Sequence, residues 1–232
     1  SVQSDIVFPT GASGAGASLV YNNNVSPTTS ALSNVRNVGF NNEGTIALAL
    51  TTTYLQRFNL STPFDLSTMT EDAGNTNSSQ HSADLGGFAI KPDGTKYWFG
   101  DYSQDLVKQF TMSTAWSPST ASYDGYYRFN FGGSWNSFNG GGSIPSTNNF
   151  NPMGFQFNSD GTKFLTIMWD NVPYHSIAEF TLSTPWDIST LSYTSYANLD
   201  GTVDPEAFVI SPDGLKLMLH GYNSGGSAGV EV

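Results

Sequence analysis

The sequence predicts an all-β fold: a β-propeller of four blades, each with four antiparallel strands, closed by an N-terminal strand. Three observations predict it. A motif of eleven residues occurs three times, a hairpin turn with glycine recurs four times, and short apolar runs separate these signals. These runs leave no stretch for a helix of any length, so we expect strands throughout the chain.

The repeated motif begins with Phe-x-Leu or Phe-x-Met and continues with Ser-Thr and, in two copies, Pro. It occupies residues 58–68, 110–120 and 180–190. Because Pro cannot donate a hydrogen bond to a strand ladder, the motif predicts a chain that leaves a sheet edge into a turn. A second aromatic follows the first by six positions in each copy, and we expect these residues to be buried between blades or under the turn: Phe64, Trp116 and Trp186.

The recurring turn contains Gly44, Gly94, Gly161 or Gly214, at spacings of 50, 67 and 53 residues, which lie at or above the upper range for propeller-blade repeats. Glycine adopts the positive φ that a tight hairpin turn requires. An acidic residue precedes each glycine: Glu43, Asp93, Asp160 and Asp213. Since a residue present in every blade serves the blade, we interpret these carboxylates as turn formers rather than catalytic groups.

Each repeat supplies one further strand between the motif and the next Gly-Phe strand, which makes four strands per blade. The expected blade-like repeats are residues 30–68, 69–120, 121–190 and 191–232. The last repeat ends after its third strand, so we expect an apolar segment near 17–22 to complete it. Such closure removes the exposed sheet edge that invites aggregation.

Composition excludes several function classes. Charged residues make up 12% of the chain, the formal net charge is −11 and the pI is near 4.3, whereas nucleic acids and anionic membranes bind basic surfaces. The chain has no Cys, no spacing typical of metal ligands and no nucleophile motif, so we expect no metal, no cofactor and no catalytic residue. No apolar run approaches the length of a membrane span.

Residues 126–143 form an insertion that the repeat does not require. Aromatic residues alternate there with Gly and Asn, a composition typical of binding surfaces. We expect five of them to contact a partner, either a protein subunit of a larger assembly or a surface glycan: Tyr126, Tyr127, Phe129, Trp135 and Phe138. The alternative is a loop that folds its own aromatics over the blade beneath it.

The turns also carry a resemblance to known proteins. Ser-Pro-Asp-Gly-Leu-Lys at 211–216 and Lys-Pro-Asp-Gly-Thr-Lys at 91–96 resemble the repeats of bacterial WD40-like and lactonase-like propellers. Combined with Leu-Ser-Thr-Pro-Trp-Asp-Ile-Ser-Thr at 182–190, they look like repeats of uncharacterised bacterial surface proteins and bacteriophage virion proteins. The resemblance covers residues 35–232, implies the propeller fold and carries over no catalytic residues.

These observations favour a non-enzymatic structural or recognition module of a virion or extracellular assembly. A lectin-like, carbohydrate-binding propeller is the alternative, and a propeller hydrolase such as a lactonase is a further one. An enzyme would place unlike polar residues around the central channel, and the candidates do not align between repeats. These candidates are His81, Asp101, Asp170, His175, Asp204, Glu206 and His220.

Overall fold

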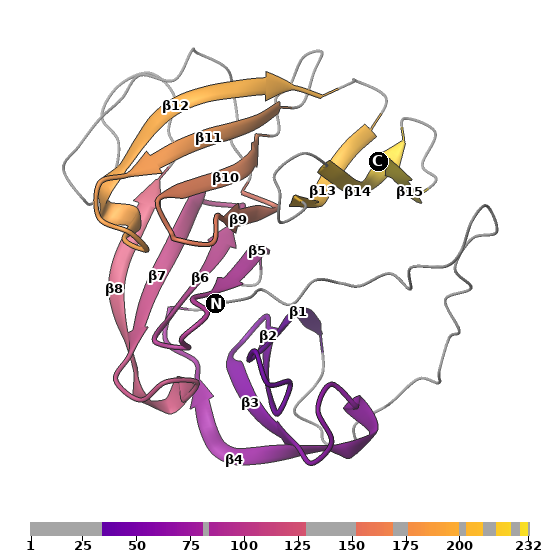
Figure 1. Cartoon of the computed structure of the whole chain (residues 1–232), viewed down its shortest axis with the longest axis vertical. Coiled ribbons are helices and arrows are strands. Elements are labelled where there is room, and N and C mark those ends of the chain that lie inside the picture. The colour runs from indigo at the N-terminus through magenta and orange to yellow at the C-terminus, as the bar shows by residue number, and fades with distance from the viewer. Residues whose placement is uncertain are drawn as a thin grey trace.

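The computed structural model describes residues 34–80, 84–128, 152–168, 176–199, 203–210, 217–223 and 228–231. Within these ranges the protein is all-β, and its strands form four antiparallel sheets arranged as the blades of a β-propeller (Figure 1). The predicted fold class is confirmed. Among the described residues the helices are three single turns of 3-10 helix, each three residues long.

Three blades have four strands each. Blade 1 contains β1 (Val35–Phe40), β2 (Ile46–Thr51), β3 (Leu55–Leu60) and β4 (Met69–Asn77). Blade 2 contains β5 (Leu85–Ile90), β6 (Lys96–Asp101), β7 (Leu106–Met112) and β8 (Ala121–Arg128). Blade 3 contains β9 (Phe155–Phe157), β10 (Lys163–Met168), β11 (Ser176–Leu182) and β12 (Leu191–Asn198).

Blade 4 contains three described strands: β13 (Val203–Ile210), β14 (Leu217–Asn223) and β15 (Ala228–Glu231). The predicted closing strand near 17–22 lies outside the described residues and stays a prediction. The first three sheets each begin at a Gly-Phe strand, so the strand from Met69 belongs to the first sheet rather than starting the second repeat.

The blades follow one another along an arc, with β1, β5, β9 and β13 innermost and β4, β8 and β12 outermost (Figure 1). Alternate side chains of each strand point to opposite faces of its sheet, so blades 2 and 3 each pack against both neighbours. Leu48 and Leu50 pack against Tyr97 and Phe99 across the first interface. Trp98 points the other way, into the cluster shared with blade 3.

The two repeated sequence signals meet in the structure. Gly44, Gly94 and Gly161 have φ of 68°, 72° and 73°, which confirms the glycine turns. The carbonyl of each accepts a hydrogen bond from the backbone N–H of the second motif aromatic, at 2.8–3.0 Å. A Cβ on Gly161 would stand 2.3 Å from the Trp186 ring, so only glycine lets the aromatic lie flat on the turn.

Burial of these aromatics differs from the prediction. Trp116 and Trp186 are only partly buried, and Phe64 is 56% exposed. Trp186 packs on Trp98 of the preceding blade, with ring centroids 6.0 Å apart. The prediction is wrong for Phe64, which belongs to blade 1: the described residues place no blade before blade 1 that could cover its ring.

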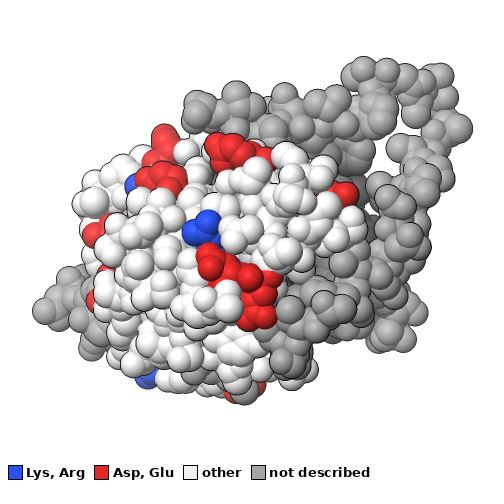
Figure 2. Space-filling view, turned by 90° about the horizontal axis from the view of Figure 1, so that it is seen from below, with Lys and Arg blue, Asp and Glu red and all other residues white. Residues whose placement is uncertain are grey.

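The surface is poor in charge, as the composition predicts. Figure 2 shows one face on which uncharged residues predominate and acidic side chains exceed basic ones. Among the described residues, no helix is long and apolar enough to cross a membrane.

Candidate functional site

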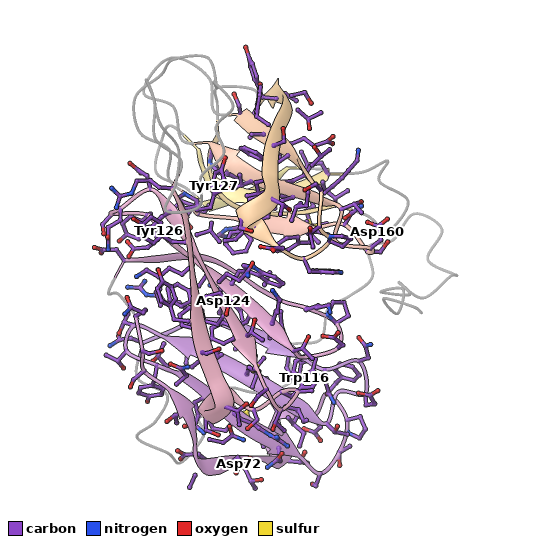
Figure 3. All side chains as sticks on the ribbon, turned by 90° about the vertical axis from the view of Figure 1, so that its left-hand side faces the viewer. Asp72, Trp116, Asp124, Tyr126, Tyr127 and Asp160 are labelled. Carbon is purple, nitrogen blue, oxygen red and sulfur yellow. The ribbon has the colours of Figure 1, made fainter. Side chains whose placement is uncertain are left out.

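The aromatic residues predicted to bind a partner begin inside a strand rather than in a loop. Tyr126 and Tyr127 belong to β8, and Figure 3 places both near one end of that strand. Tyr127 is 2% exposed and packs edge-on against Phe180 of blade 3, with ring centroids 6.4 Å apart, so its role is in the core. Phe129, Trp135 and Phe138 lie outside the described residues, where their predicted contact role stays a prediction.

The structure describes three of the polar side chains considered for the channel, and they lie on two different blades. His81, Asp170, His175 and the side chain of Asp204 are outside the described part of the chain. On blade 4, His220 Nδ1 lies 3.9 Å from Glu206 Oε2. Asp101 lies on blade 2.

The turn carboxylates serve the turns, as predicted. Asp160 Oδ1 accepts hydrogen bonds from the backbone N–H and the hydroxyl of Thr162, at 2.9 and 2.5 Å. These bonds hold the pKa of Asp160 below its usual range. Asp93 makes the same pair of contacts with Thr95. Asp213 lies outside the described residues.

Asp101 is the centre of a polar cluster at the β6–β7 turn of blade 2. Its side chain is fully buried, and Oδ2 lies 3.2 Å from Nζ of Lys108, which is also buried. Asp101 further accepts hydrogen bonds from Ser103 Oγ at 2.9 Å and from Gln104 Nε2 at 2.8 Å. Lys108 Nζ donates a second bond of 2.7 Å to the carbonyl of Gln80 and lies over the Phe99 ring.

This ion pair breaks the repeat. Aligning the second strands on their turns places Thr51 of blade 1 and Met168 of blade 3 where blade 2 has Asp101. Aligning the third strands on Phe58, Phe110 and Phe180 places Gln56 and Ala178 where blade 2 has Lys108. Since the blade folds without a charged pair at these positions, the pair points to a role specific to blade 2.

Asp105 completes the turn beside this pair. Burial raises the pKa of the Asp105 carboxyl to about 6, the Arg128 guanidinium acts against that rise, and the Asp101 charge adds to it. Asp105 also holds φ at 55°, a strained conformation for a residue other than glycine. Strained residues and shifted carboxyl groups cluster at functional sites.

Arg128, in the last position of β8, pairs across the sheet with Leu106, the residue after Asp105. Its Nε is buried and has no hydrogen-bond partner among the described residues, which is costly for a charged donor. The guanidinium also lies over the Tyr126 ring, 5.6 Å from its centroid.

The residue before β5 and the residue after β6 add further polar groups. Tyr102 Oη donates a 3.1 Å hydrogen bond to Asp84 Oδ1, which raises the pKa of Tyr102, and Arg36 is close enough to act against that rise. Three of the eight cationic side chains therefore lie around this turn of an acidic protein: Arg36, Lys108 and Arg128. The described residues contain no group of three or more His, Asp or Glu that could hold a metal ion. We call Asp101, Asp105, Lys108 and Arg128 the blade 2 cluster.

The blade 2 cluster can move a proton and bind negative charge. A carboxyl with a pKa near 6 is matched to general base or acid chemistry near neutral pH. The positive charge of the neighbouring Arg128 guanidinium can stabilise an oxyanion. Sequence comparison of the blades could have found Asp101 and Lys108 from their departure from the repeat, but no repeat signal marks Asp105.

Replacing Asp105 with Asn should change the pH dependence of stability. The folded-state pKa of about 6 lies above the ordinary 3.8, so protonation favours the folded state and wild-type stability falls as the pH rises through 6. Asn tolerates positive φ. We expect the variant to gain about 1 kcal/mol at pH 8, after discounting for solvent screening, and nothing at pH 3. Thermal unfolding at both pH values measures this, and an equal gain at both would contradict it.

Comparisons with known proteins bear on the fold. No family model and no curated protein matches the sequence. A Bacteroides fragilis protein described as a "putative 6-phosphogluconolactonase" superposes with a TM-score of 0.51 at 13% identity, over 84% of this chain and 53% of that one. A Lactobacillus plantarum protein superposes with a TM-score of 0.51 at 10% identity, over 85% of this chain and 54% of that one. A periplasmic gluconolactonase from Pseudomonas aeruginosa superposes with a TM-score of 0.49 at 11% identity, over 84% of this chain and 52% of that one.

The chain thus spans about half the length of these solved structures. The expectation of a non-enzymatic structural or recognition module of a virion or extracellular assembly is corrected here, because the proteins that share the fold include one named as a lactonase. The expectation that the chain is not an enzyme is corrected for the same reason. At these identities the likeness shows the fold: this chain is a β-propeller of a kind also found in a protein named as a lactonase.

Proposed function

We propose that this chain is a hydrolase of the lactonase type, with its reacting groups in the blade 2 cluster. The observation that carries the proposal is a half-buried carboxyl, Asp105, with a pKa near 6 beside Arg128, whose buried Nε has no described partner. The name of one structurally similar propeller, a putative 6-phosphogluconolactonase, supports a lactone as the substrate. Contact of the aromatic residues after β8 with a subunit or glycan stays a separate prediction.

In the proposed reaction Asp105 acts as a general base. Its carboxylate takes a proton from water as the water oxygen attacks the lactone carbonyl carbon. The carbonyl oxygen gains negative charge, which the Arg128 guanidinium stabilises. The ring C–O bond then breaks, and the ring oxygen leaves as a hydroxyl with the proton held by Asp105. One water is consumed, and the product is a hydroxy acid.

The buried pair has a positioning role in this scheme. Asp101 holds Ser103 and Gln104 by hydrogen bonds, and these two residues precede Asp105 in the turn. Lys108 ties the same carboxylate to the carbonyl of Gln80. Fixing both ends of the turn keeps Asp105 in its strained conformation, so the reacting carboxylate needs little reorganisation.

The test is hydrolysis of gluconolactone, with and without a 6-phosphate, by the wild type and by Asp105→Asn. We expect kcat/KM of the wild type to rise with pH through about 6, because a general base must be deprotonated. Asp105→Asn should lower kcat/KM by about 100-fold or more and abolish that rise. Arg128→Lys, which keeps the charge but lacks Nε, should lower kcat by about 10-fold or more.

The matched control is Asp72→Asn, which removes a carboxylate paired with Arg57 at 3.3 Å on blade 1. It should leave kcat/KM unchanged. If the wild type hydrolyses neither lactone, or if Asp105→Asn hydrolyses both at the wild-type rate, the proposal is wrong.

A further inference from the structure

Arg36 is the extra residue of a β-bulge on the innermost strand of blade 1. The β1–β2 ladder pairs Val35 with Thr51. It next pairs Asn37 with Leu50, which leaves Arg36 without a partner across the ladder. Arg36 is exposed. A bulge turns a side chain out of the regular pleat, and bulges are frequent beside active sites.

The repeat does not require a positive charge at this position. The residues that stand eight positions before the four turn glycines are Arg36, Gly86, Met153 and Glu206. Blade 4 has the same bulge, since its β13–β14 ladder skips Glu206. A blade therefore forms with a glycine, an apolar residue or an acid there, and the charge of Arg36 serves something other than the fold of blade 1.

Arg36 stands beside the turn between β6 and β7. Strand β1 lies next to β5, and Asn37 Nδ2 donates a 3.1 Å hydrogen bond to the carbonyl of Gly86. Two residues earlier, Asp84 accepts two hydrogen bonds from Tyr102: its carbonyl from the backbone N–H at 3.0 Å, and its Oδ1 from Oη at 3.1 Å. The bond to Asp84 raises the pKa of Tyr102, and the Arg36 charge opposes that rise.

This turn joins Arg36 to the blade 2 cluster. Asp101 pairs with Leu106, so Tyr102 and Asp105 begin and end a four-residue turn. Residues that face each other across paired strands have Cα atoms about 5 Å apart, and the two ends of the turn are similarly close. A molecule of the size of a sugar therefore reaches from Asp105 to the surroundings of Tyr102, where Arg36 stands.

Arg36 and Arg128 differ from the other cationic residues. Seven of the eight are described, and five of these pair with a carboxylate at 2.7–3.9 Å: Arg57, Lys91, Lys96, Lys108 and Lys163. Within the described part of the chain, Arg36 and Arg128 have no such pair, and both lie beside the β6–β7 turn.

The charges around this turn are balanced. The ionised carboxylates there belong to Asp84, Asp101 and Asp105. Arg36, Lys108 and Arg128 offset them, so the turn is neutral in a chain whose formal net charge is −11. A negatively charged ligand meets less repulsion here than the charge of the whole chain implies.

We propose that Arg36 binds a carboxylate or phosphate group of the substrate while Asp105 and Arg128 act on its lactone ring. The inference rests on the proposed function for the lactone ring, and it adds a negatively charged group to the substrate class. A guanidinium presents a planar fork of N–H donors that matches the oxygens of either group. Its charge also favours the approach of such a ligand from solution.

The binding of three sugars tests this inference separately from catalysis. Glucose, glucuronate and glucose 6-phosphate differ in one terminal group, which is a hydroxymethyl, a carboxylate or a phosphate, and none of them is a lactone. In calorimetric titrations at low salt, we expect the wild type to bind both anionic sugars at least about 10-fold more tightly than glucose. The tighter of the two identifies the group that Arg36 binds.

Arg36→Gln should lower both affinities to that for glucose. The variant should fold, because the equivalent positions of the other blades hold a glycine, a methionine and an acid. The matched control is Lys91→Gln, which removes a cation of blade 2 at the opposite end of β6, about 20 Å along the strand. That distance exceeds the Debye length of about 10 Å, so all three affinities should stay unchanged.

Three sugars bound equally by the wild type, or bound by none of the proteins, would overturn the inference, as would a preference for the anionic sugars that survives in Arg36→Gln. A wild type that hydrolyses gluconolactone but binds the three sugars equally retains the proposed function and loses this inference. A wild type that hydrolyses neither lactone but binds the anionic sugars through Arg36 retains the anion site and loses the proposed reaction.

Discussion

Replacing Lys108 with Met is expected to destabilise the folded protein by about 3–5 kcal/mol. Lys108 lies 3.2 Å from the fully buried carboxylate of Asp101, and Met would leave that charge without its cation. Ser103 and Gln104 would still donate hydrogen bonds to Asp101, but two neutral donors do not replace an ammonium group. Urea unfolding at pH 7 measures the loss.

Blade 1 provides the matched control. The double variant Asp101→Thr with Lys108→Gln copies Thr51 and Gln56, which blade 1 buries at the same positions. The double variant removes both charges together, so it should be nearly as stable as the wild type and more stable than Lys108→Met. A loss below about 1 kcal/mol for Lys108→Met alone would show that Asp101 becomes protonated or hydrated at little cost.

The double variant also separates structure from function. It should fold, since blade 1 folds with the same neutral residues, yet it no longer ties the turn before Asp105 to Gln80. If the buried pair positions Asp105, the double variant loses lactone hydrolysis while keeping most of its stability. Equal activity of the double variant and the wild type would reduce the pair to a structural feature.

The fold could be predicted because its signals repeat. The glycine turns, the Ser-Thr-Pro motif and the apolar strands each recur at blade spacing, and the structure joins them through the hydrogen bond from each motif aromatic to its turn glycine. The repeat did not predict how exposed each aromatic is. Phe64 and Trp186 hold the same motif position, but their burial depends on the preceding blade, and the described residues place no blade before blade 1.

The candidate site could be predicted only in part. Asp101 stood among the polar candidates because of its residue type, whereas Lys108 and Arg128 did not. Their nearness to Asp101 and Asp105 comes from pairing between strands, since Arg128 lies opposite Leu106 across the β7–β8 ladder. The raised pKa of Asp105 arises from burial, which no local sequence pattern encodes.

Replacing Trp186 with Ala should cost about 3 kcal/mol, at the lower end of the range for large aromatics because the ring is only partly buried. The ring lies 5.1 Å from Phe157 and 6.0 Å from Trp98 of the preceding blade, so Ala would open the contact between blades 2 and 3. Urea unfolding measures the loss. A cost below about 1 kcal/mol would mean that the motif aromatic adds little beyond its turn.

Phe64→Ala is the control at the same motif position, where the described residues place no preceding blade. It should cost less than about 1 kcal/mol, because the ring is 56% exposed and its aromatic neighbour is Phe40, 5.8 Å away. Equal costs for Phe64→Ala and Trp186→Ala would contradict the dependence of this contribution on contact with the preceding blade.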